Sequence, residues 1–287
     1  MDERRLRYFL TVLEEGSVTR AAARLRVAQP SLSQALRAFE AELGVELFDR
    51  VGRGLRPSAA GEALSGPARQ VLRSIDEARH AVSGVVELRS GTLELAALAT
   101  LAVDPMAALI GRFRERYPGV QVRMLEADSA AGVSALVGEG ACELGAATLP
   151  VSGRGLTTQP LPAQELTFIL PPSASAGEPL RARELARTPL VVSPPGTSTR
   201  ILLEQALAEV GVRPRIAVET AAREAIVPLV LAGAGAALLP APLAREAERR
   251  GAVVRAARPA ITRRIGLVHR TGTPSAAARA FLSLASA

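Results

Sequence analysis

Cysteine and histidine are almost absent from this chain, and the absence excludes two kinds of site. The 287 residues include one cysteine, Cys142, and two histidines, His80 and His269. A single cysteine cannot form an intramolecular disulfide, and so few soft ligands cannot assemble the usual metal clusters. The composition therefore excludes a zinc finger and a two-cysteine redox switch, and we expect neither a metal nor a cofactor.

Long hydrophobic runs are also missing. No apolar stretch approaches the roughly 18 to 20 residues that a membrane span requires. The first residues, MDERRLRYFL, lack the long apolar segment and the small-residue cleavage site of a secretory signal. We therefore expect a cytoplasmic protein without membrane contact. The length is sufficient for two or three domains, since one domain usually takes roughly 100 to 200 residues.

Lysine is absent, so arginine alone provides the basic charge behind the net +7. Residues 1–90 contain 14 arginines against 12 acidic residues, whereas residues 178–287 contain 16 against 8. The excess therefore lies in the C-terminal third. Net charge alone does not indicate nucleic-acid binding here, and any such function has to be argued from local patterns.

The first fifty residues indicate three short helices. Gly16 and Ser17 can end one helix and cap the next, and Pro30 with Ser31 can open the third, because proline is tolerated in a first helical turn. The third helix has an apolar stripe that we expect to be buried: Leu32, Leu36, Phe39 and Leu43. Its opposite face is polar and short-chained, as in a recognition helix that enters the major groove of DNA.

The exposed face of the third helix provides the candidate base contacts. Gln34 can pair with adenine, and Arg37 with guanine or a phosphate. The alternative is an ordinary solvated helix face. The candidates on this face are Gln29, Pro30, Ser31, Ser33, Gln34 and Arg37.

The segment LFDRVGRGLRPSAAGEAL predicts a β-hairpin with a basic tip, because two glycines lie between its arginines. Such a wing can contact phosphates or enter the minor groove through Arg50, Arg53 and Arg56. The alternative is a basic hairpin exposed only to water.

Residues 59–90 predict one long helix. Apolar residues recur at alternating spacings of four and three, which is a heptad seam typical of a helix that pairs with a second copy. A rod of some 31 residues would be about 45 Å long and too thin to form a domain. We expect dimerisation through Leu64, Ala68, Val71, Ile75, Ala78, Val82 and Val85.

From residue 91 onward, apolar strands alternate with amphipathic helices, which predicts an α/β domain with largely parallel strands. Two successive rounds of this pattern imply two halves with a cleft between them. The expected strands cover 93–99, 120–125, 143–149, 165–171, 189–193, 215–219, 236–240 and 261–270. The expected helices cover 105–117, 130–139, 199–210, 223–232 and the segment after Pro274.

Hydroxyl side chains gather where several of these strands end, and parallel α/β domains bind ligands at that edge. Helix N-termini there favour an anion such as a carboxylate, and Arg200 can provide a charge. The alternative is that the serines and threonines only cap helices. The effector-binding candidates are Thr100, Leu101, Asp128, Ser129, Thr197, Ser198, Thr199, Arg200 and Thr220.

With these motifs in place, the chain resembles the LysR-type transcriptional regulators over nearly its whole length. The resemblance is specific over about sixty residues from RYFLTVLEEG to GEAL, and it continues in FRERYPGVQVRMLE, GACELGAAT and LVLAGAGAALLP. One departure bears on DNA reading, since the family commonly has arginine or lysine at the position of Gln34.

The resemblance implies a winged helix-turn-helix domain at 1–58, a linker helix at 59–90, and an effector domain at 91–287. It further implies that the effector domain consists of two Rossmann-like subdomains of the type 2 periplasmic-binding-protein kind, with a small inducer between them. Subdomain I would comprise 91–161 with 268–287, and subdomain II would comprise 162–267. The family also favours a tetramer.

The leading hypothesis is a sequence-specific DNA-binding regulator that responds to a small effector. Its expected partners are double-stranded DNA, the effector, further copies of itself and, as a possibility, RNA polymerase. One alternative is a regulator whose C-terminal domain only assembles the protein. Another is an enzyme or transport-type binding protein, but the sequence shows neither a catalytic constellation nor a phosphate-binding loop after a strand.

Overall fold

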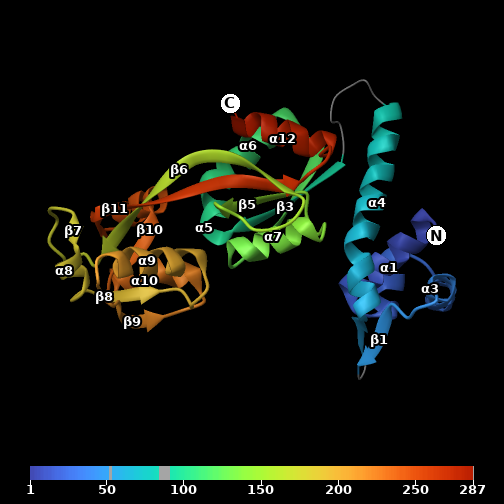
Figure 1. The fold of residues 1–287 in the computed structure, drawn as a ribbon, viewed down its shortest axis with the longest axis horizontal. Helices are drawn as coiled ribbons and strands as arrows, with labels where there is room; N and C mark the ends of the chain where they lie inside the picture. The colour runs from blue at the N-terminus through green and yellow to red at the C-terminus, as the bar shows by residue number, and fades with distance from the viewer. Residues whose placement is uncertain (52–53, 84–90, 287) are drawn as a thin grey trace.

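The computed structural model describes residues 1–51, 54–83 and 91–286, which form three bodies in a row (Figure 1). A small helical domain with one long helix, α4, lies at one end. The other two bodies are α/β subdomains, which we call subdomain I, next to α4, and subdomain II, at the far end. Among the described residues, no helix is long and apolar enough to cross a membrane.

The N-terminal domain has the predicted winged helix-turn-helix order. Its elements are α1 (Glu3–Glu15), α2 (Val18–Leu25), α3 (Gln29–Leu43), β1 (Phe48–Val51), β2 (Gly54–Pro57) and α4 (Ala59–Ser83). Gly16 ends α1 in the left-handed conformation, at φ 56°, and the Ser17 side chain accepts a hydrogen bond from the Arg20 amide at the start of α2. The Gly16–Ser17 pair therefore separates the two helices as predicted.

The core of this domain corrects two expectations. Leu43 was expected to be buried, but it is 36% exposed, because it lies at the end of α3 beyond the packed part of the helix. Ala68 was expected in the dimer seam, but it is 1% exposed and lies in the domain core, against which Leu64 also packs. The first turns of α4 therefore bury their apolar side chains within their own chain.

The remaining seam candidates lie farther along α4. Val71 is 41% exposed, and Ile75 is half-buried. The side chains of Ala78 and Val82, and the whole of Val85, lie outside the described residues. Dimerisation through this part of the helix stays a prediction.

The effector domain, residues 91–286, follows the predicted alternation of strands and helices. The elements up to the middle of the domain are β3 (Gly91–Leu98), α5 (Ala99–Leu101), η1 (Ala102–Met106), α6 (Ala107–Arg116), β4 (Val120–Ala127), α7 (Ala130–Gly138), β5 (Leu144–Thr148) and β6 (Leu156–Leu170). The rest are β7 (Leu180–Arg181), α8 (Ala182–Leu185), β8 (Pro189–Val192), α9 (Ser198–Glu209), β9 (Arg215–Glu219), η2 (Arg223–Ala225), α10 (Ile226–Leu231), β10 (Ala237–Pro240), α11 (Ala241–Arg249), β11 (Val253–Arg270) and α12 (Ala276–Ser286).

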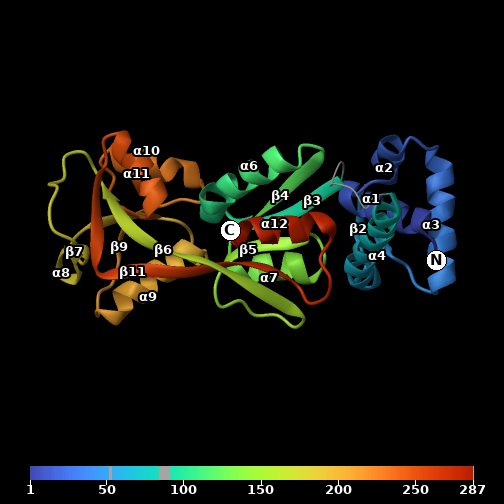
Figure 2. The same cartoon turned by 90° about the horizontal axis from the view of Figure 1, so that it is seen from above.

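Two long strands correct the expectation of a largely parallel sheet. β3 does pair in parallel with β4 and β5, and β8 with β9. However, β6 and β11, which are 15 and 18 residues long, run antiparallel to each other through both subdomains (Figure 2). β11 is also antiparallel to β5, and β10 to β6. The sheet order is therefore β10-β6-β11-β5-β3-β4, with β7 beside β11.

The buried side chains show where the chain passes from one subdomain to the other. Leu161 packs in the core of subdomain I and Leu166 in that of subdomain II, while Ile261 belongs to subdomain II and Ile265 to subdomain I. We therefore propose subdomain I as 91–161 with 265–286, and subdomain II as 166–261. The second boundary is a few residues earlier than the sequence suggested.

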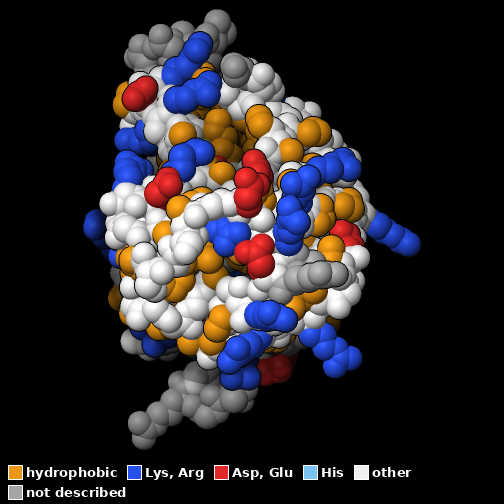
Figure 3. Space-filling view, turned by 90° about the vertical axis from the view of Figure 1, so that its left-hand side faces the viewer, with side chains coloured by type: hydrophobic (Ala, Val, Ile, Leu, Met, Phe, Trp, Pro, Cys, Tyr) orange, Lys and Arg blue, Asp and Glu red, His pale blue; other side chains and the backbone are white. Residues whose placement is uncertain are grey.

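Arginine side chains are spread over the outer end of subdomain II, with fewer acidic side chains among them (Figure 3). This end of the molecule lies opposite the N-terminal domain (Figure 1). The arginines at this end are therefore remote from the helix-turn-helix, and they do not contribute a local basic surface there.

Candidate DNA-binding surface and effector cavity

The polar face of α3 points to solvent. Leu32, Leu36 and Phe39 are 0%, 6% and 0% exposed, and they fix the opposite face of the helix against the domain core. The predicted candidates are then presented outward, with Ser33 half-buried at the edge and Gln29, Pro30, Ser31, Gln34 and Arg37 exposed. One contact orders this face internally, because Gln29 Nε2 donates to Ser33 Oγ over 3.2 Å.

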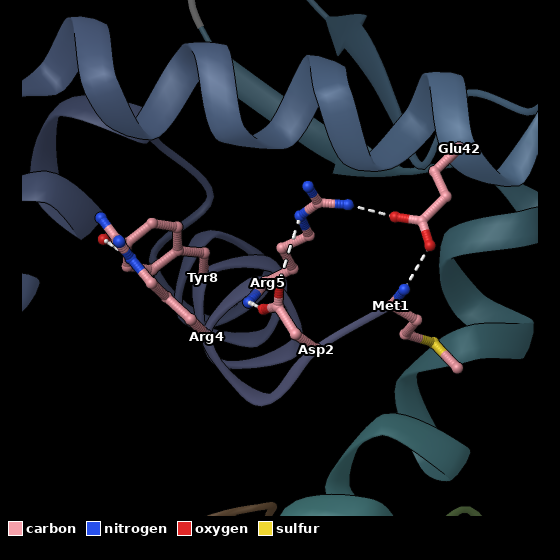
Figure 4. Close-up of polar contacts among 6 residues, drawn as sticks. All are labelled: Met1, Asp2, Arg4, Arg5, Tyr8 and Glu42. Atoms are coloured by element: carbon pink, nitrogen blue, oxygen red, sulfur yellow. Dashed lines mark hydrogen bonds and ion pairs between the residues drawn. The ribbon is translucent and has the colours of Figure 1, made fainter.

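Several arginines on other faces of this domain are neutralised by acidic partners. The guanidinium of Arg5 lies between Asp2 and Glu42, and the amino group of Met1 also contacts Glu42 (Figure 4). Another pair joins Arg7 to Glu3. The further pairs are Arg20 with Glu15, and Arg24 with Glu14 and Glu15.

Arg37 on α3 and Arg56 on β2 differ from these arginines. Both are exposed, and within the part of the chain that the structure describes neither guanidinium forms a hydrogen bond or an ion pair. The uncompensated positive charges of the domain therefore include one on the predicted recognition helix and one on the wing. A phosphate backbone attracts such free cations more strongly than paired ones.

The wing forms as predicted, with β1 and β2 antiparallel and Asp49 opposite Arg56. Of the three predicted wing contacts, only Arg56 can be placed by its side chain. The Arg50 side chain and the whole of Arg53 lie outside the described residues.

A cavity of about 550 Å³ lies between the two subdomains. Subdomain I contributes the segment after β3 and the end of β4. Subdomain II contributes the end of β8, the first turn of α9, and parts of α10, β10 and α11. Six predicted effector residues line it: Thr100, Asp128, Thr197, Ser198, Thr199 and Arg200.

The other three candidates do not line the cavity. Leu101 is fully buried in the core of subdomain I. Ser129 caps α7, since its hydroxyl accepts from the Gly132 amide at 3.1 Å, and Thr220 accepts from the Ala222 amide at 3.1 Å. For Ser129 and Thr220 the alternative of local capping is therefore the observed arrangement.

Arg200 faces the cavity with its charge already shared. Its side chain is 6% exposed, Nε donates to Glu204 over 2.5 Å, and Nη1 lies 3.4 Å from Glu219. Nη1 also donates to the Ser193 carbonyl. These contacts fix the first turn of α9 to the end of β8, so the primary effect of Arg200 is to shape the cavity wall.

Two contacts join the subdomains at the cavity. The Ser198 amide donates to the Asp128 carbonyl over 3.3 Å. Arg223 on η2 pairs with Asp128 at 2.6 Å and lies 3.7 Å from Glu126. Arg223 was not among the predicted site residues, because its partner Asp128 lies 95 residues earlier in the chain.

The sequence also missed most of the apolar wall. The lining is mainly aliphatic, and it includes Val103, Ile226, Val227 and Leu243. The helix α11, which carries Leu243, was not predicted at all. Glu246 from the same helix and Arg250, directly after its end, also line the cavity.

A buried polar network lies beside the cavity, centred on Arg263 of β11. This side chain is 2% exposed. Its Nε and Nη2 donate to Gln164 Oε1 at 2.9 and 2.7 Å, and its Nη1 donates to Thr100 Oγ1 at 3.0 Å. Gln164 Nε2 in turn donates to Asp104, at 2.6 Å to Oδ2 and 3.0 Å to the carbonyl.

Burial lowers the pKa of Arg263 to about 10, and the nearby Asp104 raises it in part. A pKa of about 10 still leaves the guanidinium charged at neutral pH. One sequence signal could have indicated this residue, because the strand alternation that buries Ile261 and Ile265 also turns Arg263 inward.

Comparison with known protein families identifies both halves of the chain. Residues 4–62 match the family described as bacterial regulatory helix-turn-helix protein, lysR family. Residues 87–287 match the LysR substrate binding domain. A curated relative, the probable HTH-type transcriptional regulator LrrA of Synechococcus elongatus, is 31% identical over 241 residues, which cover 84% of this chain and 81% of LrrA.

Solved structures show the same fold. A full-length OxyR variant from Pseudomonas aeruginosa superposes with a TM-score of 0.80 at 23% identity, covering 100% of this chain and 94% of that one. Full-length CbnR in complex with its target DNA gives 0.70 at 24% identity, covering 100% and 99%. Together with the family matches, these comparisons show that the chain belongs to the LysR family and is a DNA-binding transcriptional regulator with a C-terminal substrate-binding domain.

Proposed function

We propose that this regulator recognises a specific operator through α3 and the wing, and that a small anionic effector in the cavity controls it. The observation that carries the DNA part is the exposed face of α3 with the unpaired Arg37, together with the unpaired Arg56 of the wing. The similar fold of CbnR, which was solved with its target DNA, supports this role for the N-terminal domain.

In this proposal α3 lies in the major groove and the wing lies along the backbone. Gln34 would read an adenine, and Arg37 would contact a guanine or a phosphate. The remaining α3 candidates, which are Gln29, Pro30, Ser31 and Ser33, would contact base edges or phosphates at the start of the helix. Arg50, Arg53 and Arg56 would contact phosphates or the minor groove.

Two features of the cavity support an anionic effector. Three half-buried hydroxyls, those of Thr100, Ser198 and Thr199, line it beside the buried Arg200, and the first turn of α9 directs its positive dipole end toward the same space. The acidic residues of the lining lie at the rim. The side chains of Asp128 and Glu126 are 82% and 64% exposed, so solvent screens their charge.

Assembly completes the proposal, because operators read by a pair of winged domains require two copies at a fixed spacing. The exposed Val71 on α4 is available for helix pairing. We propose a dimer through this part of the helix and a tetramer built from two such dimers.

The test is selection of genomic fragments by the full-length protein at near-physiological salt, followed by sequencing of the retained DNA. Enrichment of a few dyad-symmetric sites is the expected result. Retention of all DNA equally, with steep salt dependence, would contradict sequence-specific recognition. A regulator whose C-terminal domain only assembles the protein would give the same sites, and no small acid would change its affinity for them.

A further inference from the structure

Arg263 is one of the largest fully buried side chains, and among the described residues its guanidinium forms no direct ion pair. In the described part of the chain, its three hydrogen bonds go to two neutral groups, the Gln164 amide oxygen and the Thr100 hydroxyl. Asp104 is the nearby acid, and it is bonded to Gln164 instead. Burying a cation without a directly paired anion is unfavourable, so such a site points to a role besides stability.

The Thr100 hydroxyl connects this cation to the cavity. Thr100 lines the cavity, and its oxygen is occupied as an acceptor by Arg263 Nη1. Because a hydroxyl has one proton to donate, and Thr100 donates to no group among the described residues, that proton is available to a ligand. The adjacent guanidinium withdraws electron density from the oxygen and strengthens this donor.

We propose that Arg263 is a positioning residue for effector recognition. It orients Thr100 as a polarised hydrogen-bond donor, which makes the cavity prefer a carboxylate on an aliphatic body over the corresponding neutral amide. The aliphatic body follows from the cavity wall, which is mainly aliphatic and includes Val103, Ile226 and Val227. This inference rests on the proposed function, because it concerns the effector of the same cavity.

The position of Arg263 also connects ligand binding to the two long strands. Arg263 on β11 lies directly opposite Gln164 on β6, and the register shifts between Arg263 and Ile265. The two residues therefore join β6 and β11 where both strands pass between the subdomains. A ligand that binds Thr100 acts on this junction through one hydrogen bond, so Arg263 also provides a physical connection from the cavity to the crossing strands.

The test compares hexanoate with hexanamide, which have nearly the same shape but differ in charge. Binding to the full-length protein is measured by calorimetry in the absence of DNA. We expect the unmodified protein to bind hexanoate more tightly than hexanamide. Thr100→Val removes the hydroxyl with little change of shape, and Arg263→Lys keeps the charge but lacks the planar guanidinium that donates to Gln164 and Thr100 from separate nitrogens. Each substitution should weaken hexanoate binding about tenfold, with a change of less than about threefold for hexanamide.

Arg270→Lys is the matched control, since Arg270 is a half-buried arginine on the same strand, β11, and it donates to the Val137 and Cys142 carbonyls, away from the cavity. It should leave the preference for hexanoate unchanged. If Arg263→Lys fails to fold, which circular dichroism would detect, Thr100→Val decides the proposal alone. An unchanged preference in Thr100→Val would overturn the proposal, as would the absence of hexanoate binding to the unmodified protein. Neither of these results bears on operator recognition, because fragment selection tests DNA binding independently.

Discussion

At the scale of single residues, the DNA-binding surface depends on side chains with two different roles. In the proposed function Gln34 reads a base edge in the major groove, whereas Arg56 on the wing contacts a phosphate or the minor groove. Both side chains are exposed. The two roles give different signatures when each residue is replaced, because base contacts set sequence preference and phosphate contacts set salt-dependent affinity.

We expect Gln34→Ala to relax the preference at one base pair of each half-site, at a cost of about 1 to 3 kcal/mol for the favoured base. Arg56→Ala should weaken binding to all sequences and reduce the slope of log affinity against log salt by about 1. Fluorescence anisotropy on operator variants at several salt concentrations measures both. Arg7→Ala is the control, because Arg7 is paired with Glu3 and should change neither quantity. Equal effects of Gln34→Ala on all sequences would contradict base reading.

The sequence was sufficient to predict the exposed face of α3, because helical periodicity is local. Alternation of buried and exposed positions along one helix needs no knowledge of its neighbours. It was insufficient for Arg263, whose partners Gln164 and Thr100 lie 99 and 163 residues away in the chain. For Ser129 and Thr220 it could not decide between capping and ligand binding, since both need a hydroxyl at the same place.

At the scale of elements, one acidic side chain joins two helices of the N-terminal domain. Glu42 near the end of α3 accepts from the Met1 amino group and from Arg5 on α1 (Figure 4). The hydrogen bond from the amino group, more than the contact with Arg5, lowers the pKa of Glu42 below its ordinary 4.5. A carboxyl whose pKa is lower in the folded state stabilises the fold above its ordinary pKa, and this contribution is lost as the pH falls.

Glu42→Gln should therefore lower the unfolding temperature at pH 7 slightly, because the ion pairs are exposed. The difference from the unmodified protein should shrink as the pH falls from about 4.5, where Glu42 of the unfolded chain becomes protonated, through the lower pKa of Glu42 in the folded protein. Thermal unfolding followed by circular dichroism between pH 7 and pH 3.5 measures this. Glu46→Gln is the control, since Glu46 forms no ion pair among the described residues. A difference that stays constant with pH would exclude the ion pairs as its cause.

Two glycines of α4 permit close approaches on two sides of the helix. A β-carbon at Gly61 would collide with the Leu47 carbonyl of the N-terminal domain, and one at Gly66 would collide with the Glu139 carbonyl of subdomain I. Neither glycine has an unusual backbone conformation, so close packing is the reason that alanine would not fit. The two contacts can be separated experimentally.

Gly61→Ala should destabilise the N-terminal domain by about 1 to 3 kcal/mol through overpacking. Gly66→Ala should leave that domain intact and loosen the contact of α4 with subdomain I. Hydrogen exchange followed by mass spectrometry distinguishes the two, since faster exchange is expected in α1 to α3 for the first variant and around residues 136–143 for the second. Faster exchange in the same segments for both variants would contradict this separation.

Most helices and strands could be predicted from the sequence, but the residues at which several of them begin could not. β6 was expected to begin at residue 165, yet it begins at Leu156, and β11 begins at Val253 instead of 261. The missed first parts, residues 156–164 of β6 and 253–260 of β11, are partly exposed and interrupted by prolines. They therefore lack the continuous apolar run that indicated the rest of each strand. The helix expected over 105–117 is also preceded by helical turns, α5 and η1, which begin at Ala99 directly after β3.

At the scale of the whole molecule, the proposed assembly depends on the exposed part of α4. Val71→Arg should weaken self-association by placing a charge in the helix pair, and sedimentation velocity should show a shift toward smaller species. Gln70→Arg is the control. This substitution adds the same charge at another exposed position. Gln70, however, lies at the side of α4 that faces Glu143 and Thr271 of subdomain I. An unchanged distribution of species for Val71→Arg would show that this part of α4 is not the contact between copies.

The path of the chain through the effector domain sets an order of completion during synthesis. The N-terminal domain has all of its described core by Ala68, whereas subdomain I needs the second half of β11 and Phe281 of α12, which are made some two hundred residues later. Domains generally fold as units as they emerge from the ribosome. The DNA-binding half of this regulator is therefore complete while the half that would sense an effector still lacks part of its core, so a chain released early would keep its operator-reading surface and lose its control.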